Sequence, residues 1–152
     1  MPLDTLANVL GALAQAFPAK PIRLVVPYAP GGAVDALARP IAQKLGESIG
    51  QSIVVDNKPG GNATIGAENV RQSPPDGYSI VLTSINHYLV PFFSKNVPYD
   101  AMRDFVPIVN VAVAPNMVAV HPSVPIHSIP ELVDYAKKNP GKLFYGTTGI
   151  GS

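Results

Sequence analysis

The stretch from Arg23 to Leu45, "RLVVPYAPGGAVDALARPIAQKL", decides the fold of this chain. Residues 22–27 are apolar apart from Arg23 and do not alternate with polar residues, which is typical of a strand that is buried on both faces. After two adjacent glycines, Leu37, Ile41 and Leu45 follow at intervals of four and predict a helix with one apolar face. A Gly-Gly turn between a buried strand and a helix indicates that another molecule approaches the backbone closely there.

Pro40 lies inside this expected helix. It removes one backbone hydrogen bond and predicts a kink, unless the helix begins late, near Asp35. Gly46 and Gly50 are expected to end the helix.

The same alternation of strand and helix continues along the chain. "SIVVDN" (52–57) and "YSIVLTS" (78–84) predict two more strands, and residues 65–71 predict a short helix between them. This order predicts an α/β fold with a parallel sheet. Ligands of such sheets bind outside the carboxyl ends of the strands, so the candidate loops are "PYAPGG", "NKPGGNAT" and "TSINHY".

The second half of the chain has a different pattern. Residues 97–107 predict a surface connection, and the alternating run 108–120 predicts one or two strands. Ser128, Pro130 and Glu131 are spaced as in a capping box, which predicts a helix from Pro130 to Asn139. "LFYGTTGIGS" at the end predicts a strand that runs into a Gly/Thr loop.

Composition excludes several classes of protein. Of the 152 residues, 47% are hydrophobic and 14% are charged, and the formal net charge is +1. This balance gives no reason to expect nucleic acid or an anionic membrane as a partner. The absence of cysteine from the sequence excludes a disulfide framework, thiol catalysis and thiolate metal sites.

The first 16 residues differ from the rest. "LANVLGALAQA" (6–16) is apolar, too short to span a bilayer, and ends in an A-x-A pattern. We interpret residues 1–16 as a signal peptide remnant that export removes, although no basic residue precedes Lys20. The alternative is an amphipathic helix that belongs to the mature protein.

Few chemical motifs are present. The fingerprints of dinucleotide sites, P-loops and the nucleophile elbow do not occur in the sequence. Gly31 and Gly32 are expected to leave backbone N–H groups free for an anion, and a carboxylate fits better than a nucleotide because it needs fewer donors. Asp35 is expected in the first turn of the helix, where it could orient a loop or a bound water.

The histidines carry little information. His87, His121 and His127 do not stand at metal-ligand spacing with carboxylates, so no metal site is expected. His121 and His127 are interpreted as loop residues. His87 follows a strand and either faces a ligand or is a solvent-exposed histidine.

Taken together, five stretches resemble the substrate-binding proteins of tripartite tricarboxylate transporters, the Bug family. They stand in this order in the chain: PIRLVVPYAPGGAVD, VVDNKPGGNATIGAENV, PDGYS, VPYDAMRDFVPI and AKKNPGKLFYGTTGIGS. The resemblance implies a periplasmic-binding-protein-like, two-lobed (Venus flytrap) fold, of which this chain is expected to hold an incomplete part. Residues 20–103 are then lobe one, 104–110 the hinge and 111–152 the first part of lobe two.

The resemblance also implies a function without catalysis, cofactor or metal. Such a protein captures a small mono- or dicarboxylate in the cleft between its lobes and passes it to membrane permease subunits. The residues implied in ligand binding are Tyr28, Ala29, Gly31, Gly32, Asp35, Ser84 and His87 in lobe one, and Thr147, Gly149 and Ser152 in lobe two. Ala33 and Val34 depart from the Ser-Thr that family members often carry, so a hydroxyl donor is missing here.

Two other functions stay open from the residues. A binding protein of this type can act as a sensor that reports its ligand to a signalling partner. The Gly-rich loops could also serve an α/β enzyme that uses a nucleotide or a phosphorylated substrate, although the phosphate motifs are missing.

Overall fold

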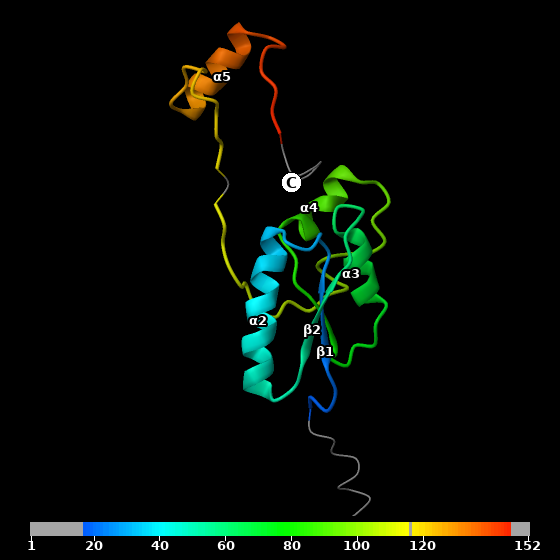
Figure 1. Ribbon diagram of the computed structural model, residues 1–152. Helices are drawn as coiled ribbons and strands as arrows, with labels where there is room; N and C mark the ends of the chain where they lie inside the picture. The colour runs from blue at the N-terminus through cyan, green and yellow to red at the C-terminus, as the bar shows by residue number, and fades with distance from the viewer. Residues whose placement is uncertain (1–16, 116, 147–152) are drawn as a thin grey trace, which may run out of the picture. The chain divides into compact units, whose positions relative to one another are not determined.

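The structure is a computed structural model that describes residues 17–115 and 117–146 (Figure 1). The chain divides into two compact units between Val106 and Pro107, and each unit is described by itself. This boundary falls in the segment 104–110, which was predicted as a hinge. That the two units correspond to two lobes stays a prediction.

The first unit contains a three-stranded parallel sheet, which confirms the predicted arrangement. Its strands are β1 (Ile22–Val26), β2 (Ile53–Asn57) and β3 (Ser79–Val81), in the order β2-β1-β3. The register pairs Ile22 with Ile53, and Arg23 with Ser79. The central strand therefore has a neighbour on each side, and β3 is shorter than the predicted strand 78–84.

Helices cover both faces of this sheet. Helix α2 (Ala33–Ile49) packs on β1 and β2, and α3 (Thr64–Arg71) packs on β1 and β3 (Figure 1). Leu24 and Val26 point toward α2, where they form a core with Ala38 and Ala42. Arg23 points the other way and donates to Asn69 on α3. Because both faces are covered, β1 is apolar apart from Arg23 and its apolar residues do not alternate with polar ones.

Two single residues explain how the helices fit. Helix α2 begins at Ala33 and runs through Pro40, so of the two alternatives the late start near Asp35 does not occur. Pro40 removes the N–H that would bond the Ala36 carbonyl one turn earlier. A Cβ atom on Gly66 would lie 2.7 Å from the Pro27 Cβ. Glycine at position 66 therefore lets α3 approach the end of β1 closely.

The chain after β3 forms a helix that the sequence did not predict. Helix α4 (Asn86–Phe93) begins inside the expected loop "TSINHY". Its Val90 packs with Ala67, Tyr99 and Ala101 in a second buried cluster, against which Phe105 also packs. The interpretation of 97–107 as a surface connection is therefore wrong at Tyr99 and Ala101, which are buried.

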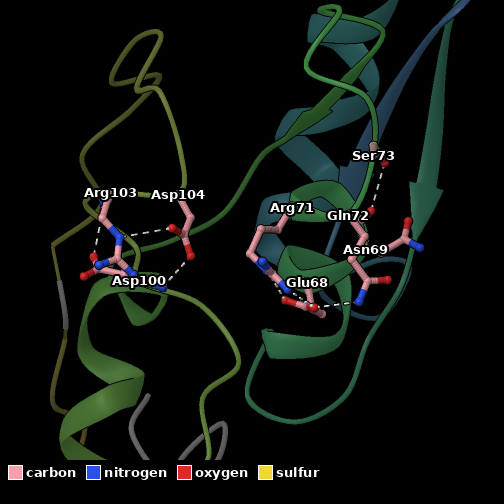
Figure 2. A network of polar contacts seen from close by, with 8 residues as sticks. All are labelled: Glu68, Asn69, Arg71, Gln72, Ser73, Asp100, Arg103 and Asp104. Atoms are coloured by element: carbon pink, nitrogen blue, oxygen red, sulfur yellow. Dashed lines mark hydrogen bonds and ion pairs between the residues drawn. The ribbon is translucent and has the colours of Figure 1, made fainter.

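Polar side chains near the second cluster form hydrogen bonds with residues close to them in sequence, on α3 and in the segment 100–104 (Figure 2). The Asp100 N–H donates to Asp104 Oδ2 at 2.9 Å, and the Arg103 N–H donates to Asp100 Oδ1 at 3.1 Å. On α3, the Arg71 guanidinium donates to both oxygens of Glu68 at 2.6 and 2.7 Å. The contacts among Asp100, Arg103 and Asp104 close the turn that follows Tyr99, whereas those of Arg71 and Glu68 lie within α3.

The second unit has one helix, α5 (Ile129–Lys138), in its described part. Ser128 caps it as predicted, since its Oγ accepts from the Glu131 N–H at 3.4 Å. Glu131 Oε2 accepts in return from the His127 N–H at 2.7 Å, one residue before the expected partner Ser128.

The predicted strands of this unit are wrong. Residues 108–115, 117–120 and 143–146 have no strand structure. A strand needs a neighbouring strand for its backbone hydrogen bonds, and the described part of this unit supplies none.

Among the residues that the structure describes, we find no helix with the length and apolar character that a membrane span requires.

Candidate functional site

The candidate site lies at the carboxyl ends of the three parallel strands. The chain leaves β1 toward α2 and leaves β3 toward α4, while β1 stands between β2 and β3. The loops after the strands are therefore neighbours at one edge of the sheet. Such an edge, where successive connections diverge from a central strand, is where ligands of parallel sheets bind.

Hydroxyl groups gather at this edge. The Tyr28 phenol shares a hydrogen bond with Ser84 Oγ at 2.7 Å and lies 3.4 Å from Thr83 Oγ1. The Ser84 N–H also donates to the hydroxyl oxygen of Tyr28, at 3.3 Å. The structure thus brings together Tyr28 and Ser84, which were both predicted as site residues. Thr83 was missed, although its hydroxyl group stands in the loop "TSINHY".

Asp35 orients the loop after β1. It lies in the first turn of α2, as predicted, and is only 2% exposed. Its carboxylate accepts from the Gly31 N–H at 2.9 Å and from two nitrogens of Arg39 at 2.9 and 3.0 Å. The hydrogen bond from Arg39 first, and then those from Gly31 and Asn57, lower the pKa of Asp35 from 3.8 to about 2. Asp35 is therefore charged at neutral pH and neutralised by Arg39.

The backbone N–H groups of Gly31 and Gly32 are not free, which corrects the prediction. The Gly31 N–H is bound to Asp35, and the Gly32 N–H donates to the Ala29 carbonyl at 3.3 Å. Gly31 has φ +82°, a left-handed conformation in which glycine is unstrained. The geometry therefore makes this turn a self-bonded loop rather than an open anion cradle.

Backbone N–H groups without an acceptor among the described residues follow directly after Gly32, at Ala33 and Val34. Helix α2 begins at Ala33, and Gly32 supplies no side-chain cap. The N–H groups of Ala33 and Val34 have no acceptor among the described residues, as is general for the first turn of a helix. These two N–H groups, together with the positive end of the helix dipole, can bind an anion.

Asn57 is a site residue that the sequence analysis missed. Its amide donates to the Tyr28 carbonyl at 3.1 Å and to Asp35 Oδ1 at 2.9 Å. The only signal was an amide at the carboxyl end of a predicted strand. The neighbouring Lys58 lies 3.5 Å from Asp56 Oδ2, so its charge is partly balanced.

His87 is not a loop residue. It lies in α4, is 3% exposed, and stacks on Tyr99 with ring centroids 5.0 Å apart. The Phe105 ring meets it edge-on at 4.7 Å. Burial lowers the pKa of His87. The solvent-exposed interpretation is wrong, and contact of His87 with a ligand stays a prediction.

Some predicted residues lie outside the described part of the chain. These are Thr147, Gly149 and Ser152, and also the interpreted signal peptide remnant, residues 1–16. Their roles stay predictions.

Sequence comparison places the chain next to a family of transport receptors. The sequence model of the "Tripartite tricarboxylate transporter family receptor", TctC, matches residues 37–152. A protein encoded in the tcbD-tcbE intergenic region of Pseudomonas sp. strain P51 is 44% identical over 90% of this chain and 41% of its own length. BugT of Bordetella pertussis is 33% identical over 91% of this chain and 43% of its own.

Solved structures give the same result. Rpa4515 of R. palustris, determined with adipate, matches with a TM-score of 0.76 and 36% identity over 90% of this chain and 46% of its own. The periplasmic binding protein BugD matches with a TM-score of 0.66 and 33% identity over the same shares. MatC of Rhodopseudomonas palustris, with bound malate, matches at 0.56 and 31% identity over 60% of this chain and 31% of its own. The chain spans less than half the length of these relatives.

Proposed function

We propose that this chain, which belongs to the tripartite tricarboxylate transporter receptor family, binds a small carboxylate at the loops that follow β1, β2 and β3. Its role is to capture this ligand for a transporter, and not to catalyse a reaction. The observation that carries the proposal is that the N–H groups of Ala33 and Val34, in the first turn of α2, have no acceptor among the described residues. They lie at the same edge of the sheet as the hydroxyl groups named above.

The charges at this edge favour an anion held by neutral donors. The Asp35 carboxylate is buried and neutralised by Arg39, so it does not repel a negative ligand strongly. Lys58 is already paired with Asp56. The phenol of Tyr28 and the hydroxyl groups of Thr83 and Ser84 can donate to a carboxylate by rotating their O–H bonds.

The chemistry of two structural relatives supports this ligand class. Adipate is present in the Rpa4515 structure and malate in the MatC structure. Both are dicarboxylates. We therefore propose a small mono- or dicarboxylate as the ligand. From the second lobe, the proposal includes Thr147, Gly149 and Ser152, which lie outside the described residues.

We also propose the periplasm as the place of action and membrane permease subunits as partners. The family consists of transporter receptors, and the relative BugD is a periplasmic binding protein. Fractionation of cells that produce the protein from its natural gene tests the location. Retention of the protein in the cytoplasmic fraction would contradict it.

The central test is ligand titration of a complete form, in which this chain is followed by the second half of Rpa4515. Calorimetry is run with adipate, malate and the uncharged diamide of adipate, and we expect binding of a dicarboxylate only. Gly32→Val should abolish this binding with little loss of folding. A Cβ atom at position 32 would lie 3.3 Å from the Ala29 oxygen, so the loop needs only a small shift, while the added side chain occupies the space of the ligand.

Lys58→Ala is the matched control. Because Lys58 is partly exposed and paired with Asp56, its loss should change the binding free energy by about 1 kcal/mol or less. If no carboxylate binds, or if Gly32→Val binds within about twofold of the unchanged protein, the proposed site is wrong.

A further inference from the structure

The amide of Asn57 links two loops that are far apart in sequence. Asn57 ends β2, whereas Tyr28 and Asp35 belong to the loop and helix after β1. Its Nδ2 donates to the Tyr28 carbonyl at 3.1 Å and to Asp35 Oδ1 at 2.9 Å. Its Oδ1 accepts from Arg39 Nη2 at 3.3 Å. One side chain thus has all its hydrogen-bonding groups engaged with the neighbouring loop and helix.

The link continues to the backbone that precedes α2. Asp35, whose carboxylate receives one hydrogen bond from Asn57, uses its other oxygen to hold the Gly31 N–H at 2.9 Å. Arg39 also donates to both oxygens of Asp35, so without Asn57 the carboxylate stays paired but loses the hydrogen bond that connects it to β2. Hydrogen bonds therefore connect Asn57 to the Gly31 backbone through Asp35.

The third strand joins the same network. The Tyr28 residue whose carbonyl accepts from Asn57 also carries the phenol that bonds to Ser84 after β3. The loops after β2, β1 and β3 are in this way connected in series. A shift at the hydrogen bond between Asn57 and the Tyr28 carbonyl, or at the one between Tyr28 and Ser84, changes the position of the Tyr28 hydroxyl group relative to the first N–H groups of α2.

We propose that Asn57 is a positioning residue, which sets the geometry of the Tyr28–Gly32 loop for carboxylate binding. This inference rests on the proposed function. It assigns to Asn57 an effect on affinity through Tyr28 and Asp35, without any contact between Asn57 and the ligand.

Asn69 offers a matched comparison inside the same unit. It is also a half-buried asparagine whose side chain makes a long-range hydrogen bond, since its Oδ1 accepts from Arg23 Nη1 at 2.9 Å. It lies on α3, however, and contacts none of the groups of the loop network in its hydrogen bonds. A purely structural role of Asn57 would make the two positions behave alike.

The experiment compares Asn57→Leu with Asn69→Leu in the complete form with adipate and malate as the probes. Both variants should lower the midpoint of urea unfolding, and Asn57→Leu should lower it more, because it loses three side-chain hydrogen bonds where Asn69→Leu loses one. Only Asn57→Leu should weaken binding of the carboxylate, by about tenfold or more, which is the factor that corresponds to 1.4 kcal/mol. Binding by Asn57→Leu equal to that of Asn69→Leu would overturn the proposal.

A second variant and a second readout keep the test decisive. Asn57→Asp keeps the shape but replaces the donor by a carboxylate oxygen opposite Asp35, and it should bind still more weakly. Amide hydrogen exchange at Gly31, followed by NMR in the absence of ligand, should be faster in both Asn57 variants and unchanged in Asn69→Leu. Unchanged exchange at Gly31 would overturn the inference.

The exchange readout also separates this inference from the proposed function. If the unchanged complete form binds no carboxylate, the proposed function fails, and with it the effect on affinity. Faster exchange at Gly31 in the Asn57 variants would then still support the positioning of the loop by Asn57.

Discussion

Both units of this chain contain apolar runs, but only the run in the first unit forms a buried strand. In the first unit, Val25 and Val26 of β1 are fully buried between neighbouring strands and helices. In the second unit, the described residues of the alternating run, 108–115 and 117–120, have no strand structure, and Val113 is 84% exposed. An apolar pattern therefore becomes a strand only where another strand supplies hydrogen bonds and another layer supplies cover.

The helices make the same point. Helix α5 has the stronger local signals, with the Ser128 cap, Pro130 in its first turn and basic residues in its last turn, yet none of its residues is buried. Helix α2 lacks a side-chain cap and contains Pro40, yet it covers the sheet with Ala38 and Ala42. Local signals begin and end a helix, and tertiary packing provides most of its stability.

The largest expected difference between the units is in proteolysis. Thermolysin cleaves next to apolar residues, and we expect it to cut within 107–120 at least about tenfold faster than within 22–82, because few buried contacts protect the second unit. Mass spectrometry of the early fragments measures this. In the complete form, the segment 107–120 should become protected. Early cuts in the sheet of the first unit would contradict the comparison.

Truncation of one valine in each unit sharpens the contrast. Val26→Ala removes two buried carbon atoms from the core of the first unit, and we expect it to lower the free energy of unfolding by about 2–3 kcal/mol. Val113→Ala changes an exposed side chain and should stay within about 0.5 kcal/mol of the unchanged chain. Urea unfolding followed by circular dichroism measures both. Equal effects would mean that residues 107–120 also have a packed core.

Acid should act on the first unit through Asp35. Its pKa is about 2 in the folded state and 3.8 as an ordinary carboxyl group. In this window the unfolded chain binds more protons, so the contribution of Asp35 is fully present above about pH 4 and is lost as the pH falls toward 2. Asp35→Asn should therefore lose less stability between pH 4 and 2 than the unchanged chain does in urea melts. An identical acid dependence would show that the charge of Asp35 does not stabilise the loop.

The smallest expected effect is that of His87 near neutral pH. Burial lowers its pKa below 6.5 in the folded state, so the unfolded chain takes up the proton first as the pH falls. The free energy of unfolding should therefore decrease as the pH falls below about 6.5. His87→Phe should flatten the slope between pH 6.5 and 5, and His127→Phe at an exposed position is the control. An unchanged slope in His87→Phe would contradict burial of His87.

Much of the first unit follows from the sequence. Apolar runs separated by Gly and Pro predicted the order of β1, α2, β2, α3 and β3 and the parallel sheet, and five motif blocks indicated the family that the comparisons then showed. Asp35 in the first turn of α2 and the Ser128 cap of α5 were also predictable. The helices, the strands and the cap depend on residues within a few positions of each other, which periodicity and capping rules can read, whereas the family was indicated by resemblance.

Only the tertiary structure decided which groups at the strand ends are available. Asp35 takes the N–H of Gly31, and Asn57 bonds to Tyr28 across 29 residues of sequence. His87 lies in an unexpected helix against Tyr99, and residues 108–120 form no strand in their described part. A hydrogen-bond partner or a covering layer from a distant part of the chain leaves no periodic mark on the local sequence, so its presence or absence appears only when the chain is folded.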